Sequence, residues 1–431
     1  MSTATATATT APQPATSRTT EAPARRLASA NAVALVGALG SLSIASVIVA
    51  RLAGPDGVGV YALLRVLPWL AGVVLSSGLP MASSYVISSG RVPRSSLNPT
   101  IALGMLVYGG GASLLWLAAS PLLHRAFFSE TSVALVALSA PLVITQLVTV
   151  TAKACAQGGD DLGGSNAIIF LEEFLFLPGY GVALGVGFRG TTAVIVGLLC
   201  GGTAAAVFGL GRLAVRGFFR DWSAPSRGAA RQLASFGARS QLGNLLWLMN
   251  SRLNLIILGA MAGPTVVGVY AVASKAAELM RLPATAANYV LYPRFSRLSP
   301  PDAARQARHL VVRAGGATVA LTPIVAVACL AIPMLFGTKF HSAVFPAVIL
   351  VLGLAPEGAA AVSSAYLLGS ARPGLNSFAM GMGVVVTVGL DLLLIPAHRA
   401  VGAAIATTAA YVVTTSLLVA LQRRGVRAAL A

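Results

Sequence analysis

The chain reads Gly54-Pro55-Asp56-Gly57-Val58-Gly59-Val60-Tyr61-Ala62 and, 209 residues later, Gly263-Pro264-Thr265-Val266-Val267-Gly268-Val269-Tyr270-Ala271, with seven of nine positions identical. A looser match aligns Arg189-Gly190-Thr191-Thr192-Ala193 with Arg399-Ala400-Val401-Gly402-Ala403 at an offset of 210. Because the two offsets are nearly equal, we interpret the pattern as an internal duplication. The alternative is that one loop-to-helix motif arose twice by chance.

The sequence around this motif is strongly apolar. Of 431 residues, 56% are hydrophobic and 10% are charged, with a mean hydropathy of +0.81. Soluble domains carry about 25% charged residues, so most of this surface must face lipid. We predict an all-α polytopic membrane protein, since lipid-exposed segments must satisfy their own backbone hydrogen bonds. About twelve segments are long enough to span a bilayer: 31–53, 66–89, 100–122, 131–155, 165–187, 191–215, 240–261, 267–292, 310–335, 343–369, 374–396 and 400–421.

We expect the duplication to produce two six-helix bundles. Six is an even number, so both halves would enter the membrane in the same direction, related by a pseudo-twofold axis along its normal. The predicted parts are a disordered cytoplasmic tail at 1–30, an N-terminal bundle at 31–215, a basic cytoplasmic linker at 216–239, a C-terminal bundle at 240–421 and a cytoplasmic tail at 422–431.

The basic residues predict the orientation. If the N-terminus is cytoplasmic, 21 of the 30 Lys and Arg fall in cytoplasmic segments and about six on the opposite side. This bias follows the positive-inside rule. We therefore expect a multi-pass protein of the inner (plasma) membrane with both termini in the cytoplasm.

Several function classes are disfavoured. The net charge is +18, but the basic residues lie between apolar segments, so we expect no nucleic-acid partner. The three cysteines form no Cys-x-x-Cys motif, which argues against a disulfide framework or a metal site. The chain has no Gly-rich phosphate loop and no large polar loop, so we expect neither an enzyme nor a cofactor.

Three stretches carry a resemblance to a known family. They are Ala50–Tyr61, the segment from Ser235-Phe236-Gly237 to Leu291-Tyr292-Pro293-Arg294-Phe295-Ser296, and Leu394-Ile395-Pro396 followed by Gly402-Ala403-Ala404-Ile405-Ala406-Thr407. Over about residues 28 to 424 the chain resembles the polysaccharide transporter (O-antigen or lipid-linked oligosaccharide flippase) branch of the multidrug/oligosaccharidyl-lipid/polysaccharide (MOP) exporter superfamily.

The resemblance implies two bundles in a V with a central cavity that opens alternately to each side. It implies that the protein flips a lipid-linked oligosaccharide or polysaccharide precursor, such as an undecaprenyl-diphosphate-linked saccharide, from the cytoplasmic to the outer leaflet. Implied partners are membrane lipids and a polysaccharide polymerase or glycosyltransferases. Relatives often have an acidic residue at the position of Asn254 and Asn at that of Asp391, so ion coupling does not carry over from them directly.

Two other functions stay open. One is a cation-coupled multidrug or toxin antiporter of the same superfamily. The other is a membrane scaffold that recruits glycosyltransferases. A basic cavity would favour an anionic lipid headgroup, and an acidic cavity would favour cationic drugs.

Basic residues within the spans suggest a substrate site. Charges in the membrane interior are costly and usually face a cavity or a partner. We predict that Arg65, Arg252, Lys275 and Arg281, with Asn250 and Asn254, line a cavity for a pyrophosphate headgroup, because guanidinium groups bind such anions bidentately. The alternative is internal pairing of Lys275 or Arg252 with Glu278.

Acidic residues within the spans are candidates for ion coupling, namely Glu278, Glu357 and Asp391. Alternatively, Asp391 pairs with His398 or Arg399, and Glu357 satisfies a helix break after Pro356. Glu172 and Glu173 are adjacent and point about 100° apart on a helix, so we expect at most one of them at the centre of the cavity.

Overall fold

The computed structural model describes residues 21–220, 222–281, 284, 291–292 and 294–430, without the side chains of 21–30, 32, 239–251 and 276. Every regular element in these ranges is a helix, which confirms the all-α prediction. The first part of the chain forms α1 (Glu21–Leu75), α2 (Leu79–Ser89), α3 (Arg94–Phe127), α4 (Val133–Leu138), α5 (Pro141–Gly158), α6 (Leu162–Phe174), α7 (Phe176–Gly185) and α8 (Gly190–Val215).

The second part consists of two very long helices, α9 (Arg227–Glu278) and α15 (Pro373–Leu430), with several shorter ones between them. The shorter ones are α11 (Pro300–Ala328), η1 (Cys329–Ala331), α12 (Ile332–Phe336), η2 (Thr338–Ala343), α13 (Val344–Gly353) and α14 (Glu357–Gly369).

The repeated motif breaks a helix in each half. Gly54 has φ 70° and ψ −168°, and Gly263 has φ 80° and ψ 174°, a backbone conformation that glycine adopts without strain. The proline that follows each glycine has no N–H to donate to the preceding turn and is well suited to start the next helix. α1 and α9 therefore each consist of two helices that meet at a Gly-Pro step.

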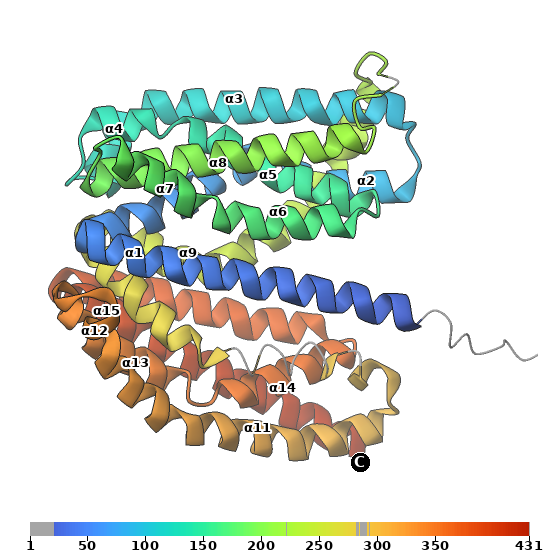
Figure 1. Cartoon of the computed structure of the whole chain (residues 1–431). Helices are drawn as coiled ribbons and strands as arrows, with labels where there is room; N and C mark the ends of the chain where they lie inside the picture. The colour runs from blue at the N-terminus through green and yellow to red at the C-terminus, as the bar shows by residue number, and fades with distance from the viewer. Residues whose placement is uncertain (1–20, 221, 282–283, 285–290, 293, 431) are drawn as a thin grey trace, which may run out of the picture.

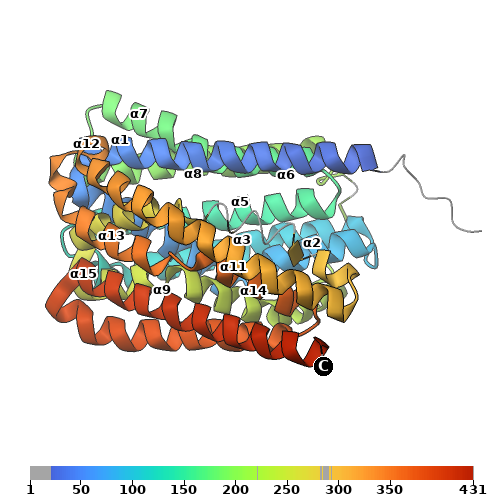
Figure 2. The ribbon, with the colours of Figure 1, turned by 90° about the horizontal axis from the view of Figure 1, so that it is seen from below.

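A third break divides α15 at Arg399, where φ is 48°. Gly190, at the start of α8, has φ 56° and precedes Arg399 by the same 209 residues that separate Gly54 from Gly263. The structural equivalent of Arg399 is therefore Gly190, one residue from the alignment that the sequence suggested. Gly383 in the first part of α15 lies against Thr414 in the second, and Figure 2 shows the two parts side by side.

The helices are long and apolar enough to cross a membrane. Among the described residues eight qualify, or nine if the bent pair at 338–353 and 357–369 is one span. Large apolar side chains are widely exposed, for example Met334 at 80% and Leu393 at 73%. The chain is therefore a multi-pass membrane protein, and the count of twelve crossings stays a prediction.

Several helix boundaries differ from those expected. Residues 21–30 and 422–430, expected as tails, continue α1 and α15. The expected linker at 216–239 is helical from Arg227 onward, where Ser226 caps α9 by accepting hydrogen bonds from Gly228 N and Ala229 N. The second helix of α1 starts at Pro55 rather than near 66, because proline is favoured in the first helical turn.

The helices form two groups. Figure 1 shows α2–α8 on one side of α1 and α9, and α11–α15 on the other. Hydrophobic cores form within the groups and also where α1 and α9 meet, with Tyr61 and Tyr270 of the two repeats both buried there. The core thus continues across the contact between the two copies of the motif.

The two copies of the motif pack against each other reciprocally. A Cβ atom at Gly59 would lie 1.7 Å from the carbonyl oxygen of Pro264, and one at Gly268 would lie 2.0 Å from that of Pro55. Such a self-complementary contact is the signature of a twofold relation between two halves. It places the motif at a pseudo-symmetric contact between the groups of helices.

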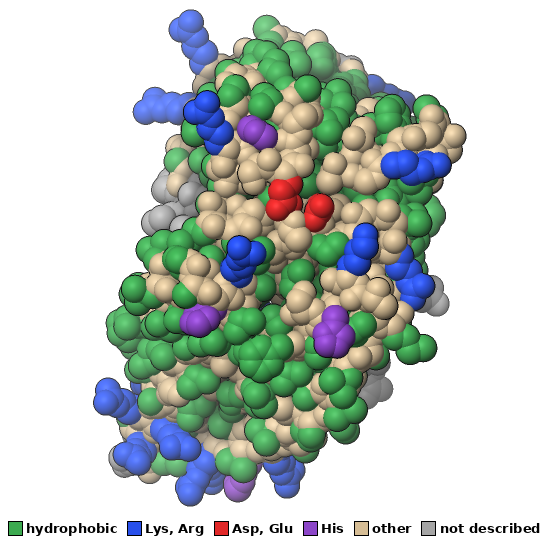
Figure 3. Space-filling model, turned by 90° about the vertical axis from the view of Figure 1, so that its left-hand side faces the viewer, with side chains coloured by type: hydrophobic (Ala, Val, Ile, Leu, Met, Phe, Trp, Pro, Cys, Tyr) green, Lys and Arg blue, Asp and Glu red, His purple; other side chains and the backbone are tan. Residues whose placement is uncertain are grey.

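Polar contacts reinforce this contact. The Thr265 hydroxyl donates to Asp56 Oδ1 at 2.6 Å, between positions that are equivalent in the two repeats, and Glu130 Oε2 also lies 2.5 Å from Thr265 Oγ1. Arg51 donates to the carbonyl oxygens of Leu335 and Met334 at 2.8 and 2.6 Å. Figure 3, which looks onto the left-hand end of Figure 1, shows acidic side chains at the centre of this end. We refer to the Gly54–Ala62, Gly263–Ala271 and Arg51 contacts as the closed end.

Candidate functional site

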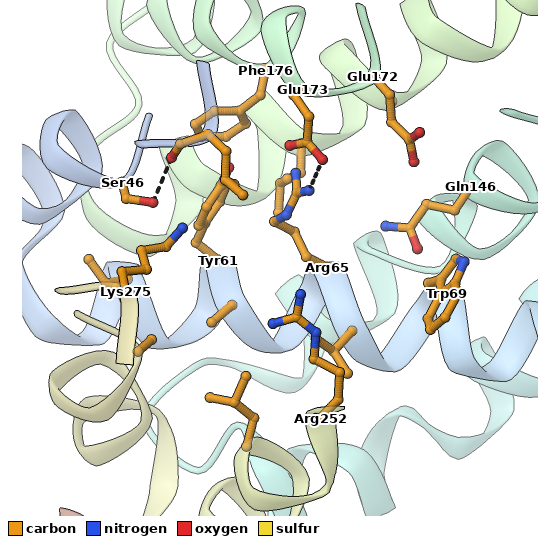
Figure 4. Close-up of a pocket in the computed structure, with 18 of the residues that line it drawn as sticks. Ser46, Tyr61, Arg65, Trp69, Gln146, Glu172, Glu173, Phe176, Arg252 and Lys275 are labelled. Carbon is orange, nitrogen blue, oxygen red and sulfur yellow. Dashed lines mark hydrogen bonds and ion pairs between the residues drawn. The ribbon is translucent and has the colours of Figure 1, made fainter. Parts of the chain in front are cut away.

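A cavity of about 400 Å³ lies between α1, α5, α6, α8 and α9, with Phe176 of α7 also on its wall. Arg65, Arg252 and Lys275 all line it, so the structure brings together three of the four basic residues that we predicted in one lining. Figure 4 shows Arg65 on the α1 ribbon, and Arg252 and Lys275 on the ribbon of α9. We call this the cationic cavity.

Arg65 is held by neighbours. Its guanidinium Nη2 lies 2.5 Å from Glu173 Oε1, and its Cζ lies 5.5 Å from the centroid of the Tyr61 ring. The Arg65 side chain is 25% exposed and that of Glu173 is 17% exposed. The dashed line between Arg65 and Glu173 in Figure 4 marks this ion pair. Arg65 therefore enters the cavity with its charge compensated.

Glu172 lines the same cavity and pairs with Lys153 of α5 at 3.1 Å. We expected at most one of the adjacent Glu172 and Glu173 at the centre of the cavity. Both line its wall, because directions about 100° apart can fall within a wall built from several helices, and which of them is central stays a prediction.

Arg252 and Lys275 differ from Arg65 in having no ion-pair partner within 4.0 Å in the described part of the chain. Glu278 lines the cavity too, but neither of the predicted pairings with Glu278 is formed there. Since Glu172 and Glu173 are neutralised by ion pairs, the uncompensated charges are Arg252, Lys275 and Glu278. The lining itself carries three basic and three acidic residues, and Lys153, which pairs with Glu172 from outside the lining, leaves Arg252 and Lys275 as two cationic groups that can meet an anion.

Arg281 does not line the cationic cavity. Its Nε lies 3.3 Å from Glu357 Oε1, and its guanidinium Cζ lies 5.1 Å from the centroid of the Tyr411 ring. α9, which carries Lys275, ends at Glu278, and Arg281 follows after the two turn residues 279–280, so Arg281 does not continue the helical face of Lys275. The predicted ion-coupling residue Glu357 is thus the partner of Arg281.

Asn254 also lies away from the cavity lining. Its Nδ2 donates to Thr407 Oγ1 at 2.6 Å and to the Tyr270 hydroxyl at 3.3 Å, and those two oxygens are 2.9 Å apart. The side chain of Asn250 lies outside the described residues. The predicted role of Asn250 in the lining therefore stays a prediction. Asn254 belongs to a separate hydrogen-bonded cluster with Tyr270 and Thr407.

Asp391, in the first part of α15, is 0% exposed. Neither of its carboxylate oxygens has a hydrogen-bond partner in the described part of the chain, so the predicted pairing with His398 or Arg399 is not formed there. A buried carboxylate without a partner is costly, which makes Asp391 an unusual group for a purely structural role.

The sequence reasoning missed Tyr61, Trp69 and Gln146, which also line the cationic cavity. Tyr61, Arg65 and Trp69 recur every four residues, the spacing that places side chains on one face of a helix. This signal was present in the sequence but was hidden because the expected helix started only at 66. Gln146 gave no such signal, since its position depends on how α5 packs against α1.

A family model described as "Polysaccharide biosynthesis protein" matches residues 48–345, more than half of the chain. No curated protein matches the chain in sequence.

Solved transporter structures share the fold. An inward-facing multidrug resistance MATE family transporter of the MOP superfamily has a TM-score of 0.73 at 16% identity, covering 91% of this chain and 95% of the transporter. An outward-facing structure of such a transporter has a TM-score of 0.59 at 17% identity, covering 94% and 96%. The lipid II flippase MurJ, in an inward closed conformation, has a TM-score of 0.70 at 13% identity, covering 94% and 90%.

Proposed function

This chain belongs to the polysaccharide biosynthesis protein family, and from that membership we propose that it flips a lipid-linked oligosaccharide or polysaccharide precursor from the cytoplasmic to the outer leaflet of the plasma membrane. The proposed cargo carries a diphosphate between lipid and saccharide, as undecaprenyl-diphosphate-linked saccharides do. The fold shared with MOP superfamily transporters supports a transport cycle in which the two groups of helices open alternately.

The observation that carries the proposal is the cationic cavity with Arg252 and Lys275 free of ion pairs among the described residues. A diphosphate entering a low-dielectric cavity needs compensating charge, because desolvation of the ion is expensive. A guanidinium and an ammonium supply several charge-assisted donors without a proton transfer. Arg65, fixed by Glu173, would contribute its remaining donors to the same headgroup.

The proposed orientation of the cavity rests on two supports. The helix arrangement is more similar to the inward-facing transporter, at a TM-score of 0.73, than to the outward-facing one, at 0.59. The bias of Lys and Arg favours cytoplasmic termini. The closed end would then face outward, and the cavity would load from the cytoplasm. Reporter fusions after Arg427 and in the 336–342 segment test this orientation, and a periplasmic C-terminus would contradict it.

We assign energy coupling to Asp391 rather than to Glu278 or Glu357. Glu357 is occupied by Arg281, and Glu278 shares the cavity with two cations. Asp391 is buried and has no hydrogen-bond partner in the described part of the chain, so a proton or a small cation would stabilise it.

A second candidate function is export of drugs or toxins in exchange for a cation. The observation in its favour is the similarity to the multidrug resistance transporter fold, together with Glu278 in the cavity. A cationic drug would have to lie against Arg252 and Lys275, which repel it. These two cations without ion pairs among the described residues therefore favour an anionic cargo.

Transport in proteoliposomes tests the proposal. A fluorescent undecaprenyl-diphosphate-linked oligosaccharide is flipped by the wild type, and Arg252→Gln is expected to slow flipping about 10-fold or more, because hydrogen bonds to charged groups contribute about 1.5–3 kcal/mol. Arg305→Gln is the matched control, since Arg305 is exposed, lies outside the cavity lining and contacts Asp302 and the Pro301 carbonyl oxygen. If Arg252→Gln flips the lipid as fast as the wild type, Arg252 is not part of the substrate site. If the wild type transports an organic cation and not the lipid, the antiporter function is favoured.

A further inference from the structure

A second pocket of about 800 Å³ adjoins the cationic cavity, lined by residues of α1, α2, α5, α6 and α9. On α5, Thr149 lines the cavity and its neighbour Val150 lines the pocket; on α6, Glu172 lines the cavity and Ile169, one turn earlier, lines the pocket. The Lys153–Glu172 ion pair joins the two walls, with Lys153 in the pocket and Glu172 in the cavity. A ligand longer than a headgroup would therefore extend from one space into the other.

The wall of this pocket differs from that of the cavity in its charge. Among the described residues that line it, Lys153 is the only one with a basic or acidic side chain. Six uncharged polar residues line it: Asn31, Ser84, Ser88, Gln157, Ser165 and Asn166. The side-chain amides of Gln157 and Asn166 make no hydrogen bond to another described residue. Donors and acceptors without partners on a concave wall are suited to a polyhydroxylated ligand.

An aromatic pair completes the pocket. Tyr85 of α2 and Phe236 of α9 stack with ring centroids 4.0 Å apart and planes 2° from parallel, and both line the pocket. Tyr85 is 41% exposed and lines the pocket, so part of its side chain is open to a ligand. A flat apolar face beside hydrogen-bonding groups matches a sugar ring, which has C–H faces and a hydroxylated rim.

We propose that this pocket is a glycan subsite that binds the first sugars of the cargo while the diphosphate lies in the cationic cavity. The assignment rests on the proposed function and adds to it, because it makes the saccharide part of what the protein recognises. The pocket size falls in the range of about 300–1,000 Å³ typical of small-molecule sites. The Lys153–Glu172 pair would mark the boundary between headgroup and glycan.

A lipid tail is a poorer occupant of this pocket. An acyl or prenyl chain would cover the amides of Gln157 and Asn166 without giving them a hydrogen bond, and burying an unpaired polar group is unfavourable. Lys153 is already paired with Glu172, so the two amides decide between the occupants. A saccharide would give both amides hydrogen bonds and cover the ring of Tyr85.

Binding of two matched probes to the purified full-length chain tests the subsite. The probes are undecaprenyl diphosphate and undecaprenyl-diphosphate-linked N-acetylglucosamine, which differ only in the sugar. We expect the wild type to bind the glycosylated probe at least about 10-fold more tightly. The double variant Gln157→Met/Asn166→Leu is expected to lose this preference while binding undecaprenyl diphosphate as the wild type does.

Two further variants make the outcomes distinct. Gln232→Met, at an exposed site that lines neither space, is the matched control and should retain the preference for sugar. Arg252→Gln should weaken both probes by the same factor. Equal binding of the two probes by the wild type, or an unchanged preference in the double variant, would overturn the glycan subsite alone. Binding of neither probe by the wild type would overturn the proposed function and the subsite together.

Discussion

At the residue scale, the charges in the membrane interior fall into three electrostatic situations. Arg65 and Arg281 each have an acidic partner, Glu173 and Glu357. Arg252 and Lys275 share a cavity without an ion pair in the described residues. Asp391 is buried in protein with no partner there. Because an ionisable group in hydrocarbon must be compensated, the last two situations are the ones that indicate a ligand.

Asp391→Asn tests energy coupling. The amide keeps the shape of the side chain but can neither bind a proton nor attract a cation, so we expect flipping that no longer responds to a proton or sodium gradient, with downhill flipping retained. The measurement is transport in proteoliposomes with and without each gradient. The control is Glu357→Gln, which removes another carboxyl in the membrane, and its dependence on the gradient should persist. Asn376→Asp, in the same helix as Asp391, adds a carboxyl instead of removing one and does not serve as this control. Loss of the response in both variants would argue against a specific role for Asp391.

The sequence could predict which residue types form the site, but not how they divide between neighbouring spaces. Arg65, Arg252 and Lys275 stood out as cations inside apolar segments and share one cavity. Arg281 looked equivalent to them, yet it lies beyond the end of α9 at Glu278 and contacts Glu357 instead. Such assignments depend on which helices pack against α9, and that information is not local in the sequence.

At the element scale, the ends of helices are fixed by particular residues. Asp161 is the N-cap of α6: its side chain accepts a hydrogen bond from Gly164 N and pairs with Arg212 and Arg216 at 2.7 and 3.0 Å. Hydrogen bonds from Arg212, and then from Arg216 and Gly164, outweigh burial and hold the pKa of Asp161 well below its usual range. Asp161 therefore joins α6 to the end of α8 as a carboxylate.

Replacement of this cap should depend on pH. Asp161→Asn keeps a capping side chain but loses the charge, and we expect a loss of about 1–3 kcal/mol of stability at pH 7. Because the folded pKa is lowered, the stabilisation by the carboxylate is fully present above the unfolded pKa of about 3.9 and is lost as the pH falls through the folded pKa. Thermal unfolding should show an equal gap between wild type and variant at pH 7 and pH 5, and a smaller gap at pH 3. A gap that widens in acid would contradict the assignment.

The closed end depends on the absence of side chains in the repeated motif. Gly268→Ala would place a Cβ atom 2.0 Å from the carbonyl oxygen of Pro55, so α1 and α9 must separate. We expect a loss of about 1–3 kcal/mol, the usual cost of overpacking, and greater access of water-soluble thiol reagents to a cysteine introduced at Asp56. Gly211→Ala is the matched control, because nothing lies within 4 Å of a Cβ there. Equal stability and equal labelling of the two variants would show that the contact is not needed for closure.

Helix type was predictable from the sequence, whereas helix ends were less so. Long apolar segments predicted α3 and α8 well, because lipid requires a continuous helix. The start of α9 at Arg227 was missed, since its first turns are basic and polar and resemble a loop. The Gly-Pro steps at 54 and 263 were recognised as a repeat, but their consequence, a helix that resumes at once, needed the structure.

At the scale of the whole molecule, the duplication has a mechanical consequence. Gly54 and Gly263, and likewise Gly190 and Arg399, have equivalent backbone breaks at one common spacing. Two similar halves that meet through a self-complementary contact can separate at that contact with little change inside either half. In the proposed transport cycle, such a movement of two nearly rigid groups would open the closed end.

A cross-link at the closed end tests this movement. Asp56 and Thr265 occupy equivalent positions of the two repeats, and their side-chain oxygens are 2.6 Å apart. In Asp56→Cys/Thr265→Cys, with the native cysteines replaced by Ser or Ala, an oxidant should form a disulfide that holds the two halves together here. If cargo leaves through this end, flipping in proteoliposomes falls at least about 10-fold after oxidation and recovers with a reductant, while each single variant is unaffected by either treatment. A disulfide formed in high yield with undiminished flipping would mean that the halves need not separate at the repeated motif, and that cargo takes another route.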